Sequence, residues 1–406
     1  MIRHDRKSGT EEKGLRVPYA LSVYGEEEAE AVARLIREHK LIIGDKTKEF
    51  EQKVATLFGK KHGIMLNSGS SANLLATELL NLPEGSEVIT PVLTFSTTVA
   101  PLLKKRLKPV YVDVIEGTYL INESKIEDEI NDKTKALFIP SLIGNIPNLK
   151  NLRNIAKKHG LFFVDDSCDT LSATYAGRPT GTYTDVSTTS FYGSHIITAA
   201  GGGGMLCVNN DEWDTKARLL RGWGRSSAVN ESEDIKRLDN SLGGMKYDLK
   251  YVFSEVGYNF LPLELQAVFG LEQLKKLKVF LATRKHNFKK LYSALSDYKH
   301  LLTLPKQDPE ADTNWLAFPI TIKEDAGFSR YEITKYLENS NIQTRPIFTG
   351  NILRQPGFED TRLDGSFPVA DRIMRNGFLV GCNQGLTDAH MDKLVGKLEE
   401  FLRGRG

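Results

Sequence analysis

A serine- and glycine-rich turn follows an early apolar run of the chain, in the segment NSGSSANLLA at residues 67–76. The turn contains Ser68, Gly69 and Ser70 and leads directly into a helical pattern. Backbone N–H groups and hydroxyls at the start of a helix bind anions, and glycine lets the backbone approach a phosphate closely. Turns of this kind also occur simply as helix N-caps. The residues of this segment alone leave both interpretations open.

Carboxylates follow another apolar run in the segment LFFVDDSCD, residues 161–169. Asp165 and Asp166 end the run, and Asp169 comes shortly after them. In open α/β sheets, ligands bind where the carboxyl ends of the strands meet. A carboxylate there can pair with a protonated ring nitrogen and keep that ring electron-withdrawing. Metal ligation and helix capping are the alternatives, but no phosphate-transfer motif or HxxE-type spacing supports a metal.

One histidine lies in the segment TSFYGSHIITAAGGGG, residues 189–204. A strand-like run leads to Ser190 and then to His195, and the four glycines Gly201–Gly204 follow. Such a glycine run disfavours helix and lets the backbone wrap closely around a ligand. A lone histidine is usually a structural residue, but these flanking residues make His195 a candidate for chemistry.

The elements that must position these segments are short apolar runs that alternate with helical patterns. Such alternation is typical of βαβ units around a mostly parallel sheet, so we expect an α/β fold. Asp45 is the expected N-cap of a helix, and residues 226–250, polar and rich in Gly and Asn, indicate a loop or a lid. We expect a flexible leader at 1–19, a large α/β domain at 20–275, and bridging helices with a small C-terminal α+β domain at 276–406.

The composition excludes several classes of protein. Lys and Arg number 54 and Asp and Glu 52, so the formal charge of +2 shows no bias towards nucleic acid or an anionic membrane. No run approaches the ~20 apolar residues that cross a bilayer, and the polar N-terminus does not match a secretory signal. The three cysteines are too few for a four-thiolate metal or iron–sulfur site and argue against a disulfide framework. We expect a cytoplasmic protein without a resident metal.

Five segments together resemble, in the same order, the DegT/DnrJ/EryC1/StrS family of sugar aminotransferases, and the resemblance spans roughly residues 20–400. The segments are NSGSSANLL, TFSTT, VDDSCDTLSA, SFYGSH with GGGG, and VGYNFLPLELQA. The resemblance implies the aspartate-aminotransferase architecture (fold type I), with a large domain around a seven-stranded sheet. It also implies pyridoxal phosphate (PLP) as cofactor and a homodimer with the active site at the subunit interface. At the position that matches His195, the family has the lysine that forms a Schiff base with the cofactor.

The resemblance also implies which residues hold the phosphate of the cofactor. Gly69 and Ser70 match the family's phosphate-binding turn, and the hydroxyl of Ser190 joins them. Asn259, in the segment GYN, is expected to reach the phosphate in the neighbouring subunit.

The ring of the cofactor is expected to contact three further residues. Phe95 matches an aromatic residue that stacks on the pyridine face, and Asp166 matches the carboxylate that pairs with the pyridinium nitrogen. Asp169 stands where most of the aminotransferases have Gln and the related dehydratases have Glu, near the phenolic oxygen.

Histidine in place of the lysine changes the chemistry that is possible. Imidazole cannot form the stable imine that tethers the aldehyde, but with an unperturbed pKa of ~6.5 it can transfer protons near neutrality. The cofactor is then expected to be bound non-covalently and to act as its amine form, pyridoxamine phosphate (PMP). The histidine-bearing branch of the family removes the C3 hydroxyl of a nucleotide-linked 4-keto-6-deoxysugar. We therefore predict a 3-dehydratase in 3,6-dideoxyhexose biosynthesis for a surface polysaccharide, with His195 as the base.

Two subgroups of that branch are candidates. One uses a CDP-linked sugar, an iron–sulfur cluster and a reductase; the other uses GDP-4-keto-6-deoxymannose and regenerates the amine from glutamate. RGWGRSS (221–227) resembles the cluster subgroup but has serines in place of cysteine, whereas RPIFTGN (345–351) and NGFLVG (376–381) resemble the cluster-free type. The cysteine count favours the cluster-free, glutamate-coupled cycle.

Other features leave the substrate open. Arg225 and Arg345 are candidates for binding its diphosphate or sugar, although each is also explained by a surface ion pair. Gly201–Gly204 lack an acidic residue common in the family, and Ser194 replaces a histidine common in the branch. The alternatives are an aminotransferase of the same family, including one whose lysine was replaced by engineering, a CDP-type dehydratase, and a non-catalytic binder of cofactor or nucleotide sugar.

Overall fold

The computed structural model describes residues 14–229, 235–361, 365–403 and 405. Its largest sheet has seven strands in the order β1-β9-β8-β5-β4-β2-β3. Only β9 runs antiparallel to its neighbours β1 and β8, and the remaining neighbours are parallel. This arrangement confirms the predicted α/β fold with a mostly parallel sheet. The strands are β1 (His62–Leu66), β2 (Glu87–Pro91), β3 (Lys108–Val112), β4 (Thr134–Pro140), β5 (Phe162–Asp166), β8 (Val186–Ser190) and β9 (Gly204–Val208).

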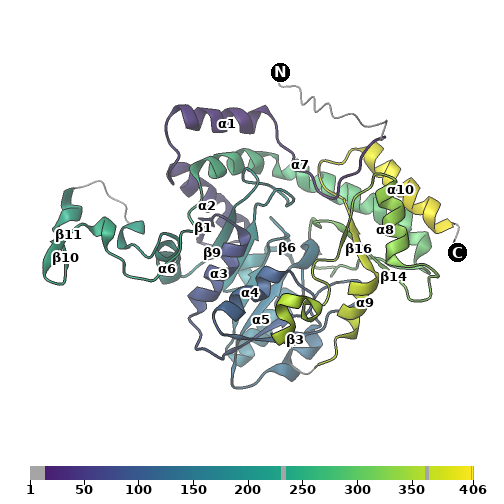
Figure 1. The fold of residues 1–406 in the computed structure, drawn as a ribbon, viewed down its shortest axis with the longest axis horizontal. Coiled ribbons are helices and arrows are strands. Elements are labelled where there is room, and N and C mark those ends of the chain that lie inside the picture. Colours follow the sequence, from purple (N-terminus) through teal and green to yellow (C-terminus); the bar gives the residue numbers. More distant parts are fainter. Residues whose placement is uncertain (1–13, 230–234, 362–364, 404, 406) are drawn as a thin grey trace.

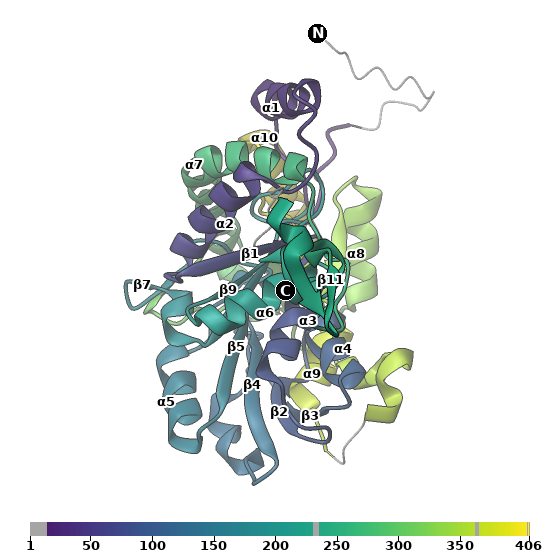
Figure 2. The same cartoon turned by 90° about the vertical axis from the view of Figure 1, so that its left-hand side faces the viewer.

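Helices cover both faces of this sheet, as Figures 1 and 2 show. Separate apolar clusters form where α3 and where α5 pack on the strands, and a third forms around α2 and the start of α7. Burial on both faces explains why the strands are continuous apolar runs rather than alternating ones. The helices are α1 (Glu26–Arg37), α2 (Asp45–Leu57), α3 (Gly69–Leu80), α4 (Ser96–Lys104), α5 (Leu149–His159), α6 (Asp211–Arg221) and α7 (Glu264–Leu295).

A smaller α+β part follows α7. Its sheet has the order β12-β14-β16-β15, with every neighbouring pair antiparallel. The predicted boundary at residue 275 falls inside α7, because this helix continues unbroken for 32 residues from one part into the other. The elements are β12 (Leu302–Thr303), β14 (Phe318–Ile322), β15 (Thr344–Pro346), β16 (Gly377–Val380), α8 (Arg330–Asn339), α9 (Pro368–Asn376) and α10 (Asp388–Arg403). A three-stranded sheet of β6 (Thr174–Tyr175), β7 (Arg178–Pro179) and β13 (Ala311–Asp312) links the two parts.

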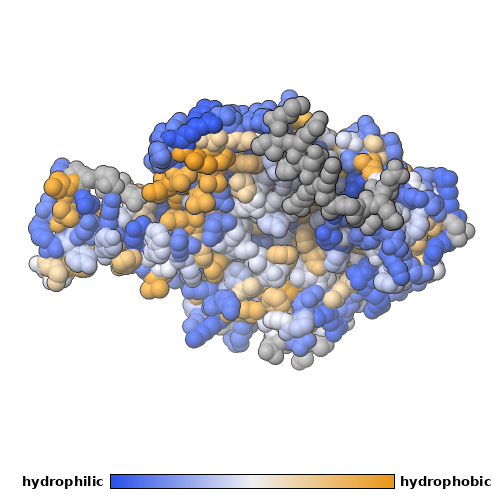
Figure 3. All heavy atoms as spheres, turned by 45° about the horizontal axis from the view of Figure 1, so that its top comes forward, coloured by the Kyte–Doolittle hydropathy of each residue, from blue (hydrophilic) through white to orange (hydrophobic). Residues whose placement is uncertain are grey.

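The segment expected as a loop or lid contains a short hairpin, β10 (Asn240–Leu242) and β11 (Met245–Tyr247). Gly243 and Gly244 both have positive φ, as a two-residue hairpin turn requires, and the glycine content of this segment reflects that turn. The hairpin lies at the end of an arm, formed by the described residues between α6 and α7, that extends away from the body (Figure 1). Apolar side chains stay exposed on it, as the orange surface at the far left of Figure 3 shows.

The N-terminal segment already packs against the rest of the chain at a residue that was predicted to belong to the flexible leader. Val17 is fully buried, its N–H donates to the carbonyl of Asn341 (2.9 Å), and its carbonyl accepts from the N–H of Gln343 (2.9 Å). The prediction of a leader up to residue 19 is therefore wrong for this stretch, since backbone pairing with a distant segment holds it. Residues 1–13 lie outside the described residues. Among the helices described, none combines the length and apolar character that crossing a membrane demands.

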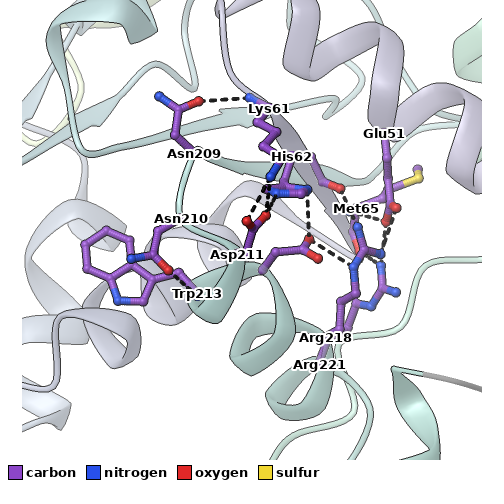
Figure 4. Close-up of polar contacts among 12 residues, drawn as sticks. Glu51, Lys61, His62, Met65, Asn209, Asn210, Asp211, Trp213, Arg218 and Arg221 are labelled. Carbon is purple, nitrogen blue, oxygen red and sulfur yellow. Dashed lines mark hydrogen bonds and ion pairs between the residues drawn. The ribbon is translucent and has the colours of Figure 1, made fainter.

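A buried ion network fixes the end of α6, from which the arm departs (Figure 4). Glu51 Oε1 accepts from Arg221 Nη1 (2.7 Å) and from the N–H of Met65 (2.8 Å), and its Oε2 accepts from Arg218 Nη1 (2.9 Å). Glu51 and Arg221 are both buried, so removing Glu51 leaves the charge of Arg221 uncompensated in the interior. The network thereby joins α2, β1 and α6 into one body.

Glu264 caps α2 from a distant part of the sequence. Its carboxylate accepts from the backbone N–H groups of Gly44 (2.8 Å), Lys46 (2.7 Å) and Thr47 (3.1 Å). The N-cap residue of α2 is Gly44 rather than the predicted Asp45, which is the first helical residue. The prediction failed because a carboxylate from the first turn of α7 supplies the acceptor that a local side chain normally gives.

Glu264→Gln is expected to destabilise the protein by about 2–3 kcal/mol, because a neutral amide loses the charge-assisted bonds and turns a donor towards N–H groups. Denaturant unfolding followed by circular dichroism measures the change. Glu272→Gln, on the same helix at a carboxylate that pairs with the exposed Lys275, is the matched control. Equal effects of the two substitutions would contradict this account of the cap.

Candidate active site

A cavity of about 480 Å³ lies at the carboxyl edge of the large sheet, and residues of the small part line it as well. Because β1, β2, β5 and β8 all point the same way, the segments that follow them meet at this edge. Most of the predicted site residues line it together: Gly69, Ser70, Phe95, Asp166, Asp169, Ser190, His195 and Arg345.

The anion-binding turn begins α3 at one end of the cavity. Ser68 is the N-cap of the helix, and its hydroxyl accepts from the N–H of Ser71 (3.1 Å). A side chain at Gly69 would place its Cβ 2.7 Å from Cβ of Ser190 and 2.9 Å from Sγ of Cys168, so this position requires glycine. The turn therefore offers both the positive end of a helix dipole and a close approach to the backbone.

Asp166 stands at the end of β5 and is held by a buried polar network. Its Oδ2 accepts from Nδ2 of Asn73 (2.8 Å) and from the hydroxyl of Thr98 (2.8 Å). The hydroxyl of Thr188 donates in turn to Oδ1 of Asn73 (2.6 Å). The N–H of Cys168 donates to the other oxygen, Oδ1 (3.2 Å). These donors fix the carboxylate in one orientation at the cavity wall, as a partner for a cationic ring nitrogen must be fixed.

Asp169 presents a second carboxyl group to the same cavity. Its Oδ2 accepts from the N–H of Ile143 (2.8 Å), a residue with φ of 59° in the left-handed region. The pKa of Asp169 is raised to about 7, chiefly by burial and also by the nearby charge of Asp166, against the opposing effect of the Ile143 N–H. Near neutral pH this carboxyl group therefore holds a proton in part of the molecules.

His195 lies in the loop between β8 and β9, where its N–H donates to the carbonyl of Tyr192 (2.9 Å). Burial lowers the pKa of His195 to about 4; contact with the backbone of Ser190 opposes this shift, and the positive charge of Arg284 adds to it. Among the described residues, the ring nitrogen Nδ1 has no hydrogen-bond partner. The imidazole is therefore uncharged at neutral pH and able to accept a proton.

Two aromatic rings and an arginine shape the mouth of the cavity. Phe95 is 50% exposed and meets the ring of Phe348 edge to face, with 5.9 Å between the centroids. Arg345 lies over the ring of Tyr19 at 5.5 Å, and its Nη1 donates to the carbonyl of Thr344 (2.7 Å). A flat ring can stack on the exposed face of Phe95.

Two predicted site residues do not line this cavity. Asn259 is exposed and bridges to Gly222 at the base of the arm. Arg225 packs its guanidinium over the ring of Trp223 at 4.4 Å. Both belong to the region that leads into the arm, and neither is among the residues that line the cavity.

Several residues of the site were not singled out in the sequence, although Asn73, Cys168 and Tyr192 lie inside the segments that were. Tyr19 lines the cavity from the stretch taken as a leader, and Cys168 and Tyr192 line it beside the predicted Asp169 and Ser190. Asn73, which orients Asp166, could have been found as an amide within the apolar stretch ANLLA of α3. Tyr19 offered no such signal, because it arrives from a distant part of the chain.

The residues of the cavity fit a phosphorylated pyridine cofactor. Gly69 leaves room for a phosphate at the start of α3, Phe95 offers a stacking face, and Asp166 is fixed as a partner for a ring nitrogen. Among the residues that the structure describes, no lysine lines the cavity that could tether the aldehyde carbon of such a group.

Comparisons with known proteins agree with this geometry. The model of the DegT/DnrJ/EryC1/StrS aminotransferase family matches residues 23–399. The chain is 38% identical to lipopolysaccharide biosynthesis protein RfbH of Salmonella typhimurium, covering 95% of this chain and 91% of that protein. It is also 38% identical to dTDP-4-dehydro-2,6-dideoxy-D-glucose 3-dehydratase of Saccharopolyspora spinosa, covering 94% and 85%.

A solved structure is also similar over nearly the whole chain. It is a GDP-4-keto-6-deoxymannose-3-dehydratase with a trapped PLP-glutamate geminal diamine, with a TM-score of 0.85 and 28% identity. The alignment covers 94% of this chain and all of that one. The predicted family, fold and resemblance to this dehydratase are thereby confirmed.

Asp169→Asn tests the effect of burial on this carboxyl group. With its pKa raised from 3.8 to about 7, ionisation of Asp169 opposes folding, so its contribution to stability is present at low pH and lost as the pH rises towards 7. Asparagine stays neutral and keeps an oxygen for the N–H of Ile143. We expect the cofactor-free variant to unfold close to the parent at about pH 4 and about 2–4 °C above it at about pH 8.

Thermal unfolding across this pH range measures the difference. Asp45→Asn, at an exposed carboxylate, controls for the loss of one negative charge. A difference between Asp169→Asn and the parent that does not grow with pH would contradict the raised pKa.

Proposed function

Because this chain belongs to the DegT/DnrJ/EryC1/StrS aminotransferase family, we propose that it is a PLP/PMP-dependent 3-dehydratase of a nucleotide-linked 4-keto-6-deoxysugar. The observation that carries the proposal is His195, uncharged and without a partner at Nδ1, in the wall of a cavity whose described lining includes no lysine. The relatives named as 3-dehydratases support the same reaction.

Different residues around the cavity would bind different parts of the cofactor. Gly69, Ser70 and Ser190 would hold the phosphate, Phe95 the ring face, and Asp166 the protonated ring nitrogen. When bound, the cofactor supplies an electron-accepting ring and, in its amine form, an amino group that condenses with a ketone. With histidine in place of lysine, these contacts must hold it without a covalent bond.

His195 would act as the base that takes up the proton whose removal starts the loss of the C3 hydroxyl. An imidazole with a pKa of about 4 is neutral at neutral pH, so one of its ring nitrogens can accept the proton directly. Asp169, with a pKa of about 7, lies in the same cavity and would hydrogen-bond the phenolic oxygen of the cofactor ring as a partly protonated acid.

Glutamate would be the reductant of the cycle. Replacing a hydroxyl by hydrogen at C3 takes up two electrons, and oxidation of glutamate to 2-oxoglutarate with release of ammonia supplies them. The solved relative that contains PLP and glutamate supports this source. The chain has three cysteines, and Cys207 and Cys382 are fully buried, which also supports a cycle without an iron–sulfur cluster.

The nucleotide end of the substrate would lie towards the mouth of the cavity. Arg345 is exposed there, where its guanidinium could pair with a diphosphate. We propose a GDP-linked sugar on the pathway to a 3,6-dideoxyhexose, because the solved relative named for a GDP-linked sugar also contains the PLP-glutamate adduct that a glutamate-coupled cycle needs. The relative named for a dTDP-linked sugar keeps another nucleotide as the alternative, and the RfbH relative supports a role in surface polysaccharide synthesis.

A homodimer would complete the site. Large apolar side chains are exposed at the start of α2, before α7 and along the arm, among them Ile42 (82%) and Val256 (96%). Figure 3 shows apolar surface gathered beside α1. Asn259 lies near this surface and outside its own cavity, so we propose that it serves the phosphate of the partner subunit. Arg225, at the base of the same arm, is placed to contact substrate there in the same way.

An aminotransferase is the second candidate, because the family as a whole is named for that activity. Both reactions share the exchange of the amino group with glutamate. They differ in the product, since only the dehydratase removes an oxygen from the sugar.

The first test is the product. The protein is incubated with PLP, glutamate and GDP- or CDP-4-keto-6-deoxyhexose, without any reductase, and the sugar is followed by mass spectrometry. We expect a product that lacks one oxygen, and ammonia in matching amount. An amino sugar as the product would overturn the dehydratase proposal.

His195→Asn is expected to lower dehydration at least about 10³-fold, because asparagine cannot take up a proton. It should still bind PMP, which a fluorescence titration measures. His195→Lys is expected to attach PLP covalently, and borohydride reduction followed by peptide mass mapping detects the bond. Unchanged dehydration by His195→Asn would show that another group is the base.

Heterodimers test whether Asn259 acts across the interface. Asn259→Ala should weaken cofactor binding, and a purified heterodimer of one His195→Asn and one Asn259→Ala subunit contains one intact site if Asn259 serves the partner. Such heterodimers are then expected to recover about half of the wild-type activity. Recovery close to zero would mean that Asn259 serves its own subunit.

A further inference from the structure

One buried arginine contacts the His195 loop, residues 191–203 between β8 and β9. Arg284, in the middle of α7, is 1% exposed and is among the largest fully buried side chains. Within the described part of the chain, none of its bonds goes to a carboxylate. A full positive charge therefore lies among neutral groups, an arrangement that a protein interior tolerates only with several hydrogen bonds.

The guanidinium of Arg284 joins segments that are far apart in the sequence. Nη1 donates to the carbonyls of Trp315 (3.1 Å) and Leu316 (3.0 Å), just before β14, and Nη2 donates to the carbonyl of His195 (3.4 Å). Nε donates to Oε1 of Gln384 (2.6 Å), after β16. The planar fork of arginine thus ties the large part, the small part and the His195 loop together.

Two further bonds extend this connection. Nε2 of Gln384 donates to the carbonyl of Ile196 (3.1 Å), next to the proposed base. The N–H of Leu316 donates to the carbonyl of Ile143 (2.7 Å), whose own N–H binds Asp169. His195 and Asp169 are therefore both connected to the segments that Arg284 holds.

The charge of Arg284 persists despite burial. Desolvation lowers its pKa to about 10, and the nearby Cys382 and Tyr19 oppose the shift, so the group stays protonated at neutral pH. A cation behind an imidazole disfavours the imidazolium form. The other groups near His195 are the backbone of Ser190, the ring of Tyr192 with 6.1 Å between the centroids, and the carboxyl groups that line the same cavity.

We propose that Arg284 is a positioning residue for the base: it fixes the His195 loop against the small part and places a permanent positive charge behind the imidazole. The inference deepens the proposed role of His195 in the dehydratase and rests on it for its functional meaning. The arrangement itself is tested on cofactor-free protein, so its outcome is independent of which sugar reaction the protein catalyses.

The experiment follows the titration of His195 by NMR in the full-length, cofactor-free protein labelled at histidine Cε1, with His195→Asn identifying the resonance. In the wild type we expect a pKa near 4. In Arg284→Gln, which keeps some hydrogen bonds but loses the charge, the pKa should rise towards the ordinary 6.5. Arg284→Lys keeps the charge and should leave the pKa low.

A second readout separates the bonds of Arg284 from its charge. One ammonium group cannot reach all the acceptors of the guanidinium, so Arg284→Lys should increase amide hydrogen exchange in residues 192–203 at least tenfold. Arg354→Gln, which removes an arginine from a surface pair with Asp371, is the matched control and should change neither readout.

The proposal is overturned if folded Arg284→Gln titrates His195 as the wild type does. Should Arg284→Gln fail to fold, Arg284→Lys decides: faster exchange confined to the loop supports the proposal, and wild-type exchange overturns it. Failure of the dehydratase assay with these NMR results intact would reject the proposed reaction and leave the positioning of His195 standing.

Discussion

The common direction of the strands is the constraint on which the rest of the structure depends. Six of the seven strands in the large sheet run the same way, and β9 alone is reversed. Three segments that are distant in sequence, those with Gly69, Asp166 and His195, consequently meet at one edge. The helices on both faces and the small part beyond α7 then enclose that edge, so a surface at the ends of strands becomes a cavity.

Enclosure also sets the protonation states. Burial disfavours charge, so it raises the pKa of Asp169 to about 7 and lowers the pKa of His195 to about 4. Between these values the acid carries its proton and the base does not, the reverse of the order in water. Pairs of groups pushed apart in this way mark the acid and base of an active site. Burial is the largest cause of both pKa shifts, and the charge of Arg284 contributes only to the shift of His195.

The parts of the site that could be predicted from the sequence are those that a short segment determines. A turn that begins a helix, two aspartates that end a strand and a histidine before four glycines are local patterns, and the structure places them together at the cavity. The parts that escaped prediction depend on distant contacts. Tyr19 reaches the cavity through backbone pairing with the segment around residue 342, and Glu264 caps a helix some 220 residues earlier. Arg284 also gave no signal in the sequence, because its acceptors come from segments distant in the chain.

On the proposed function, histidine in place of lysine at position 195 changes how the cofactor is held. A Schiff base keeps PLP in place even when other contacts are weak, and histidine offers no such bond. On the proposed function, retention depends on the sum of non-covalent contacts: the start of α3, the face of Phe95 and the fixed carboxylate of Asp166. Asn259 would add a contact from the second subunit. Cofactor occupancy and dimerisation are then linked, because a ligand that binds only the assembled site stabilises the assembly by the same free energy.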